Sequence, residues 1–159
     1  MDAEKLARRL DAEFPGTLTI TVRSPKRLYV AFASEKLPEL VASLHEQAQG
    51  LRLATATGID LRDGIGVFHH FVINGQPLVI TLKVVAPKPD PKVPSLAARL
   101  PSAKWIEREI HEMLGVEFVD HPDPRPLLKA RAFDDQLYPL RRDFDVKAFK
   151  EKIGEQLEW

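Results

Sequence analysis

Charged side chains and a histidine crowd the segment 107–112 at a spacing that could support chemistry. Glu107 and His111 are four positions apart, so a helix would place both on one face, where they could bind a metal ion. No further cluster supplies the remaining ligands, and the zinc-protease pattern is not met because its second histidine is missing. The competing interpretation, which we favour, is that Arg108 and Glu112 form an ion pair beside a solvated helical face.

The other patterns that could carry chemistry are weaker. His69 and His70 are adjacent in a strand-like segment, so their side chains point to opposite faces and cannot share one ion. We interpret them as one core histidine and one edge histidine. The 8 glycines stand singly rather than in a phosphate-binding loop, and no Gly-x-Ser-x-Gly pattern is present. The residues alone indicate no active site.

The composition excludes several classes of protein. The 159 residues carry 23 Lys and Arg against 23 Asp and Glu, which excludes the broad positive footprint of a nucleic-acid binder. The absence of cysteine excludes disulfides, thiolate zinc sites and cysteine-ligated iron–sulfur clusters. The N-terminus is charged, and the apolar runs are far shorter than the roughly 18 residues of a spanning helix. We therefore expect a cytoplasmic protein with no direct membrane insertion.

The first half of the chain alternates between helical and strand-like spacing of its apolar residues. Helical spacing covers 3–14 and 37–48, and Asn74-Gly75 is a strong hairpin signal. This order, α-β-β-α-β-β-β, predicts an α+β fold with helices packed on one face of a mostly antiparallel sheet. The predicted strands are 17–23, 27–33, 51–57, 65–73 and 78–85.

The second half begins with a proline-rich stretch, residues 86–94, which predicts a stiff extended linker. A short helix is expected over 95–100, and a longer helix follows Ser102 as its N-cap. The buried stripe of that longer helix comprises Ala103, Ile106, Ile110, Met113 and Leu114. Residues 115–145 are irregular, and a last helix is spaced through Val146, Phe149, Ile153 and Leu157.

These patterns predict two parts of the chain. Residues 1–115 form an α+β domain, and 116–159 form an extended partner-docking tail that ends in a short helix. We expect residues 1–86 to fold without the tail, because the apolar residues of their helices and strands can bury one another. Long irregular segments in small proteins are usually functional or ordered by a partner. We therefore place the function in the tail.

Two blocks in the second half hold charged residues at fixed spacing. The first comprises Glu107-Arg108-Glu109, Glu112, Met113-Leu114, His121, Arg125 and Leu127-Leu128. The second is Pro139-Leu140-Arg141-Arg142-Asp143-Phe144. Together they resemble the signature of the thirty-kilodalton (C) subunit family of respiratory complex I, which includes the related subunit of energy-converting nickel–iron hydrogenases and formate hydrogenlyase. A Gly58-Ile59-Asp60 segment agrees with this resemblance but is a weak signal by itself.

The resemblance implies a cofactor-free subunit of a membrane-associated electron-transfer complex. It implies two partners, a large subunit with a quinone or nickel–iron site and a small iron–sulfur subunit, which would hold the redox centres and keep this chain at the inner face of the membrane. The implied docking residues are Glu107, Arg108, Glu109, Glu112, His121, Arg125, Arg141, Arg142 and Asp143. The alternative is that Glu107, Arg108 and Glu112 tie the tail back to their own domain.

Some positions depart from the complex I pattern. Pro124 and Pro126 flank Arg125, the lead-in 134–138 differs, and the chain is short. These features look more like the hydrogenase and formate hydrogenlyase branch of the family. Two other functions stay open from the residues alone. One is a small stand-alone enzyme with a metal on the Glu107/His111 helix, and the other is a generic scaffolding module.

Overall fold

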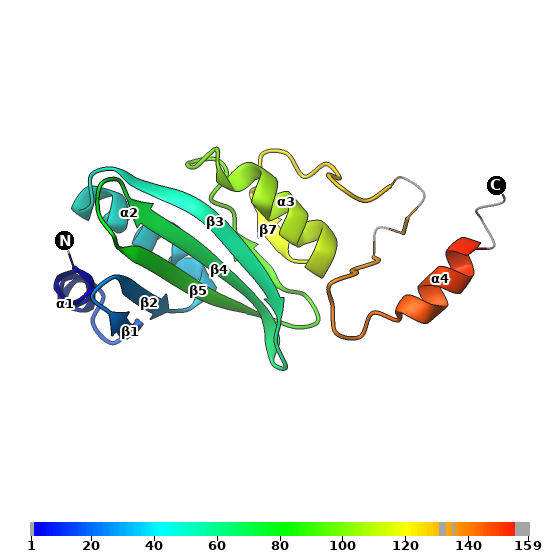
Figure 1. Cartoon of the computed structure of the whole chain (residues 1–159), viewed down its shortest axis with the longest axis horizontal. Helices are drawn as coiled ribbons and strands as arrows, with labels where there is room; N and C mark the ends of the chain where they lie inside the picture. The colour runs from blue at the N-terminus through cyan, green and yellow to red at the C-terminus, as the bar shows by residue number, and fades with distance from the viewer. Residues whose placement is uncertain (1, 131–132, 135, 155–159) are drawn as a thin grey trace.

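The computed structural model describes residues 2–130, 133–134 and 136–154. Its elements follow in this order: α1 (Ala3–Glu13), β1 (Thr19–Ser24), β2 (Arg27–Ala31), the 3-10 helix η1 (Ser34–Lys36), α2 (Leu37–Gln47), β3 (Leu51–Asp60), β4 (Gly64–Ile73), β5 (Val79–Pro87), β6 (Lys92–Pro94), α3 (Ala103–Leu114), β7 (Glu117–Val119) and α4 (Val146–Gly154). Figure 1 shows a twisted sheet with α1 and α2 at one end and α3 beside β3.

The main sheet has five strands in the order β1-β2-β5-β4-β3. The β2–β5 pair is parallel and the other three pairs are antiparallel. Apolar alternation sets this register, because a slip by one residue would turn the core side chains of each strand to solvent. The prediction of an α+β fold with a mostly antiparallel sheet is confirmed.

Helices α1 and α2 cover one face of this sheet with fully buried leucines. In α1 these are Leu6 and Leu10, and in α2 they include Leu40 and Leu44. The N–H of Lys5 donates to the Asp2 carboxylate at 2.8 Å, which caps the start of α1. Each buried leucine stabilises the fold by about 1.5–3 kcal/mol, so apolar burial dominates this half of the protein.

Helix α3 packs on the same face of the sheet, because Gly58 of β3 allows close approach. A Cβ placed on Gly58 would lie 2.5 Å from Leu114 Cδ1 and 3.1 Å from Ile110 Cγ2. The predicted apolar stripe is present, with Ala103, Ile110 and Leu114 buried. Ser102 stands at the N-cap position as predicted, but its side chain makes no capping hydrogen bond.

The predicted linker is wrong at both of its ends. Strand β5 continues to Pro87 with Ala86 buried, and residues 92–94 form β6, which pairs in parallel with β7. Val93 lies opposite Phe118, and both side chains are buried. The helix expected over 95–100 is also wrong, because this segment forms a turn in which Leu96 O accepts the N–H groups of Arg99 and Leu100. The apolar residues of 95–100 therefore do not form a helix.

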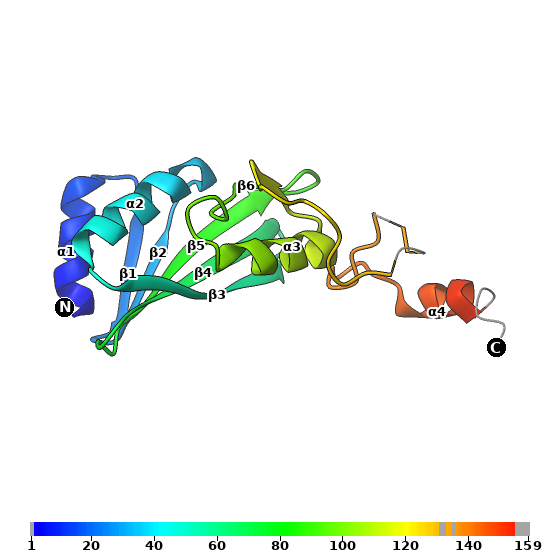
Figure 2. The same cartoon turned by 90° about the horizontal axis from the view of Figure 1, so that it is seen from above.

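The last helix lies apart from the sheet. In both views α4 occupies the end of the molecule opposite α1 (Figures 1 and 2). Its Phe149 ring contacts Phe144 and Phe133, with ring centroids 5.3 Å and 5.5 Å apart. Val146 is exposed, and Leu157 of the predicted stripe lies outside the described residues. Among the helices in the described part of the chain, none is long and apolar enough to span a membrane.

Candidate partner-docking site

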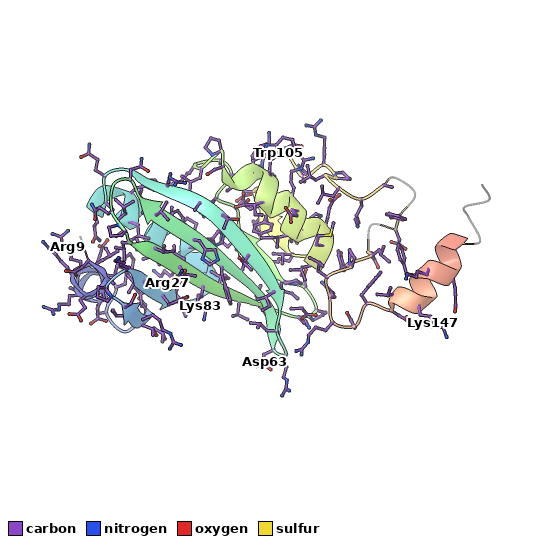
Figure 3. The ribbon with its side chains drawn as sticks, in the orientation of Figure 1. Arg9, Arg27, Asp63, Lys83, Trp105 and Lys147 are labelled. Atoms are coloured by element: carbon purple, nitrogen blue, oxygen red, sulfur yellow. The ribbon has the colours of Figure 1, made fainter. Side chains whose placement is uncertain are left out.

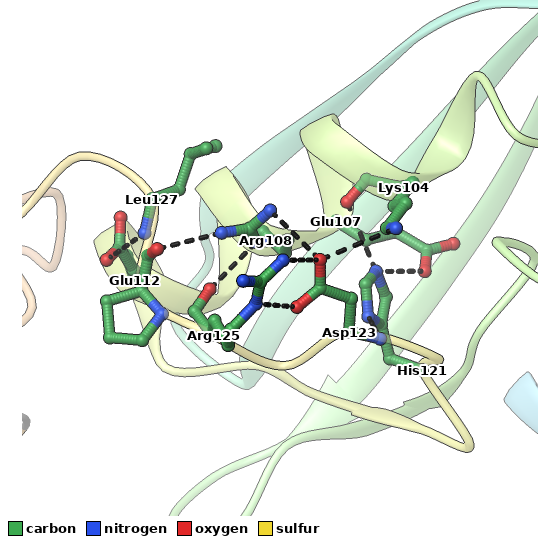
Figure 4. Close-up of polar contacts among 9 residues, drawn as sticks. Lys104, Glu107, Arg108, Glu112, His121, Asp123, Arg125 and Leu127 are labelled. Atoms are coloured by element: carbon green, nitrogen blue, oxygen red, sulfur yellow. Dashed lines mark hydrogen bonds and ion pairs between the residues drawn. The ribbon is translucent and has the colours of Figure 1, made fainter.

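The charged face of α3 is buried rather than solvated. Glu107, Arg108 and Glu112 are each no more than 7% exposed. Figure 4 shows Arg108 and Glu112 directed at the chain that runs past α3 toward Leu127, not at each other. The predicted ion pair on a solvated face is therefore wrong, and the alternative, in which these charges hold the tail to its own domain, describes the geometry.

Glu112 anchors the tail by accepting hydrogen bonds from its backbone. Its two carboxylate oxygens accept the N–H of Leu127 at 2.7 Å and of Leu128 at 2.6 Å. Burial opposes ionisation of this carboxyl. The N–H groups of Leu128, Leu127 and Lys129 outweigh that effect and lower the pKa of Glu112. The segment thus has its amides satisfied by a side chain instead of by secondary structure.

Arg108 binds the same segment from the carbonyl side. Its Nε donates to Arg125 O at 2.7 Å and its Nη2 to Pro126 O at 2.8 Å. The guanidinium also lies 5.2 Å from the Trp105 ring centroid and 3.5 Å from Asp123. A planar fork with several donors suits this arrangement, because it engages two consecutive carbonyls at once.

Glu107 joins α3 to the segment that precedes it. It accepts the Ser95 hydroxyl at 2.6 Å and the Leu96 N–H at 2.8 Å. Burial raises the pKa of Glu107, and these hydrogen bonds offset only part of that effect. His121 Nε2 approaches the same carboxyl at 3.8 Å.

His121 itself is held in one orientation. The N–H of Asp123 donates to His121 Nδ1 at 3.0 Å, so Nδ1 is the acceptor and Nε2 carries the proton. That proton faces Lys104 O at 3.1 Å. The two contacts place the turn at 121–123 against α3.

The metal interpretation of this helix finds no support in the geometry. Glu107 is occupied by Ser95 and Leu96, whereas His111 Nδ1 lies 2.8 Å from Val116 O. Across the described ranges, no group of three or more His, Cys, Asp or Glu side chains could hold a metal ion.

Arg125 is exposed but locally fixed. Its Nε and Nη2 donate to the two Asp123 oxygens at 2.6 Å and 2.9 Å. The Arg125 guanidinium lowers the pKa of Asp123 well below its usual range, despite the opposing effect of burial. Lys104 also approaches this carboxylate, at 3.4 Å. Asp123 therefore fixes the position of the Arg125 guanidinium, whose remaining N–H groups are exposed to solvent.

The second block closes over the C-terminal end of α3. Arg141 Nε donates to Leu114 O at 2.8 Å, and its guanidinium stacks 4.3 Å from the Tyr138 ring centroid. The N–H of Leu140 donates to Met113 O at 3.1 Å. Gly115 has φ +71°, and a Cβ there would lie 2.6 Å from the Tyr138 ring, so only glycine fits this C-terminal cap.

Asp60 binds the second block, a contact that the sequence did not predict. Its Oδ2 accepts the N–H of Arg142 at 2.8 Å, and its other oxygen forms an ion pair with Lys88. Burial opposes ionisation, but the Arg142 N–H and Lys88 outweigh it and lower the pKa of Asp60. The Gly58-Ile59-Asp60 segment was the sequence signal for this contact. Gly58 allows α3 to approach β3, and Asp60 binds the backbone of the second block.

The predicted docking residues therefore fall into two groups. Glu107, Arg108, Glu112 and His121 are turned inward, and Arg141 caps α3. The side chains of Glu109, Arg125, Arg142 and Asp143 remain at the surface. Three apolar side chains that were not among the predicted docking residues are also about 60% exposed nearby: Trp105, Leu128 and Leu140. Trp105 lies at the margin of the molecule on α3 (Figure 3).

The model of the family described as "respiratory-chain NADH dehydrogenase, 30 Kd subunit" matches residues 30–150. The chain belongs to this family. It is 30% identical over 150 residues to the (C) subunit of F(420)H(2) dehydrogenase from Methanosarcina mazei, covering 91% of this chain and 93% of that relative. It is 33% identical over 147 residues to a (C) subunit of NADH-quinone oxidoreductase from Rhizobium meliloti, covering 89% and 67%.

A third relative is much longer than this chain. Formate hydrogenlyase subunit 5 of Escherichia coli is 34% identical over 152 residues, which cover 90% of this chain but 26% of the relative. The resemblance predicted from the two charged blocks is thus confirmed. The chain is a complex I 30 kDa-type subunit, from a family found in respiratory and hydrogenase-like complexes.

Two solved structures share the fold. One is a chain of the membrane-bound sulfane sulfur reductase, an archaeal respiratory membrane complex, with a TM-score of 0.83 and 21% identity, covering 98% of this chain and 94% of that chain. The other is a trypsin-resistant fragment of Nqo5, with a TM-score of 0.63 and 23% identity, covering 76% and 97%. At these sequence identities the two matches show a shared fold and nothing more.

Proposed function

We propose that this chain is a cofactor-free docking subunit of a complex-I-like electron-transfer assembly, and that it binds the large subunit through an α3–tail surface. This surface comprises Trp105, Glu109, Arg125, Leu128, Leu140, Arg142 and Asp143. One observation carries the proposal. Buried charges on α3 fix the tail backbone, so that apolar and charged side chains of the tail stay exposed on a rigid base.

The rigidity of this surface favours binding. A disordered tail would lose conformational entropy on docking, whereas a tail already held by Glu112, Arg108 and Asp60 loses little. Exposed tryptophan and arginine side chains are the types that most often dominate protein interfaces. Arg125 and Arg142 can pair with carboxylates or carbonyls of a partner, and Trp105 can fill an apolar pocket.

The proposed partners are the large subunit, with a quinone or nickel–iron site, and the small iron–sulfur subunit. The chain itself offers no cysteine for a cluster, and the described residues form no metal-binding group. The chain would then lie at the inner face of the membrane through these partners. Support comes from the family and from the relatives, which are named as subunits of NADH-quinone oxidoreductase, F(420)H(2) dehydrogenase and formate hydrogenlyase.

Co-purification with the large subunit encoded in the same genome tests the proposal. Variants Trp105→Ala and Arg142→Glu of the full chain should each reduce the fraction recovered in the complex by about tenfold, because interface hot spots contribute ~2 kcal/mol or more. Arg9→Glu, on the exposed side of α1, is the matched control and should assemble normally. Circular dichroism should show an unchanged thermal midpoint for Arg9→Glu and only a small decrease for the two test variants, because Trp105 lies against Arg108 and the Arg142 charge lies near Asp60. Normal assembly of both test variants would contradict the proposal.

A further inference from the structure

The main sheet has a second face that no described helix covers. Alternation along the strands turns Arg27 and Tyr29 of β2, Lys83 of β5, Phe68 and His70 of β4, and Arg52 of β3 to this side, which we call the open face. The register places these residues in neighbouring rows. Arg27 is in line with Val79, Val72 and Arg52, and the next rows carry Tyr29 with His70 and then Lys83 with Phe68.

Charge is distributed unevenly between the two faces. The strands β2, β3, β4 and β5 contain a single carboxylate, Asp60, and it lies on the core side, where it binds Arg142 and Lys88. The open face of these strands therefore carries Arg27, Arg52 and Lys83 with no acidic residue among them. This is a local excess on a protein whose total of 23 basic residues equals its total of 23 acidic residues.

None of these three cations forms an ion pair within the described residues. Lys83 Nζ lies 4.9 Å from the Phe68 ring centroid and 5.7 Å from that of Tyr29. Arg52 Nε donates to the Asn74 side chain at 3.2 Å. Lys83 is thus held in place by two rings and Arg52 by an amide, and the charges of all three cations are available to a ligand. Figure 3 shows Arg27 and Lys83 on neighbouring strands.

His70 makes the centre of the open face rigid. Its ring lies between Thr57 Oγ1 at 3.1 Å and Thr81 Oγ1 at 3.0 Å, on the strands to either side. Burial and the nearby Arg27 lower the pKa of His70, so the ring is neutral at pH 7. The face therefore combines fixed aromatic and hydroxyl-lined area with a few permanent charges.

We propose that the open face binds an acidic protein surface, with carboxylates opposite Arg27, Arg52 and Lys83 and apolar side chains against Tyr29 and Phe68. Anionic membranes and nucleic acids are recognised by denser clusters of basic residues than three cations spread over four strands. Aromatic residues with scattered arginine are typical of a protein interface. This site is separate from the α3–tail surface. That surface lies on the opposite side of the sheet, the side of α1 and α2, and binding at the open face does not depend on it.

The first test uses the assembled complex without any variant. A carbodiimide couples a lysine amine directly to a neighbouring carboxylate, so mass spectrometry should find Lys83 joined to an Asp or Glu of another polypeptide. Lys147 on α4 is the comparison for unspecific coupling. If Lys83 couples no more often than Lys147, or only to residues of its own chain, the proposal is overturned.

The second test uses the full isotope-labelled chain, with a deca-glutamate peptide as the probe. Amide shifts should concentrate on β2, β4 and β5, and the double variant Arg27→Glu with Lys83→Glu should bind at least about tenfold more weakly, because like charges repel across an interface. Arg9→Glu should bind as the wild type does. Lys83→Met should weaken binding too, and this single variant tests the proposal if the double variant fails to fold. Unchanged binding in these variants, or stronger shifts of the same amides with phosphatidylglycerol vesicles or duplex DNA, would overturn the proposal.

Discussion

The two halves of this protein are stabilised by different interactions. The sheet with α1 and α2 is closed by leucine, isoleucine and valine side chains, many of them fully buried. Residues 125–128 and Arg142 of the tail are instead held by charged side chains that bind their backbone: Glu112 and Arg108 from α3, and Asp60 from β3. The contrast shows that a proline-rich segment poor in apolar residues can be ordered when a neighbouring helix supplies its missing hydrogen-bond partners.

This difference has an energetic consequence. Apolar burial is spread over many residues, so each core substitution lowers the stability of the whole domain. Charge-assisted hydrogen bonds to backbone are few and strong, so removing one releases a defined segment. The two regions should therefore respond differently to truncation, substitution and pH.

Truncation gives the largest expected effect. A chain cut after Gly115 loses Val116 and Phe118, which are buried with β6, and should lose about 5 kcal/mol of stability at ~1.5–3 kcal/mol for each side chain. A chain cut after Lys129 keeps both residues and the anchors on Glu112 and Arg108. It loses the Arg142 N–H bond to Asp60 and the Arg141 contacts with α3, so it should unfold cooperatively about 3 kcal/mol below the full chain.

Urea unfolding followed by circular dichroism measures both truncations. The sequence alone predicted that the cut after Gly115 leaves a folded domain, and the buried contacts of residues 116–118 predict otherwise. Equal stability of the two truncated chains would show that β7 contributes nothing to the domain and that the boundary does lie at residue 115.

The Glu112→Ala substitution should affect the tail selectively. It removes the acceptor of the Leu127 and Leu128 amides, and hydrogen bonds to a charged group contribute about 1.5–3 kcal/mol each. We expect a loss of about 3 kcal/mol, with faster hydrogen exchange at 127–129 and unchanged protection in β4. Glu109→Ala, at an exposed position of the same helix, should change stability by less than ~0.5 kcal/mol. Uniform loss of protection across the sheet would contradict the division into two regions.

Acidification should act on the apolar half through His69. This ring is fully buried and has no hydrogen-bond partner among the residues that the structure describes, and burial lowers its pKa to about 4. Because the unfolded chain binds a proton below about pH 6.5 and the folded chain does not, this residue makes stability fall as pH drops from 6.5 toward 4. Between pH 6.5 and 5 the loss is about 2 kcal/mol, at ~1.4 kcal/mol per unit.

The His69→Leu variant isolates this effect. It should lack the loss between pH 6.5 and 5 while keeping the contributions of Glu107 and the other carboxyls. The measurement is the difference in unfolding free energy between wild type and variant at several pH values. Asp60 and Glu112 have lowered pKa values, so they should reduce stability only at more acidic pH, below the ordinary carboxyl range. A difference that does not change with pH would contradict the burial argument.

The sequence was most informative where periodicity alone determines structure. The apolar run 65–73 and the Asn74-Gly75 turn signal predicted the β4–β5 hairpin, because both are local patterns, although five residues, 74–78, connect the two strands. The charged face of α3 was misread for the opposite reason. Whether Glu112 meets water or the N–H of Leu127 depends on a segment fifteen residues away, which no local pattern reports.

For the candidate site, the sequence named the charged residues but not the contacts that they make, and their part in docking stays a prediction. The charged residues were found through the family resemblance, and the structure separates those that position the tail from those left at its surface. Asp60 was missed as a site residue because its partner, the Arg142 N–H, is 82 residues away along the chain. Trp105 was missed because the sequence does not report whether a tryptophan side chain is exposed or buried.

The smallest expected effect separates two neighbouring arginines in the second block. Arg141 donates to Leu114 O at the negative end of α3 and stacks on Tyr138, so Arg141→Ala should cost about 1 kcal/mol. Arg142 donates its backbone N–H to Asp60, and its exposed side chain adds only a charge near that carboxylate. Arg142→Ala should therefore change stability by less than ~0.5 kcal/mol while still weakening large-subunit binding. Chemical denaturation and co-purification of both variants measure the two effects. If both arginines alter stability equally, the side chain of Arg142 also holds the tail, and the separation of positioning from docking residues fails at this pair.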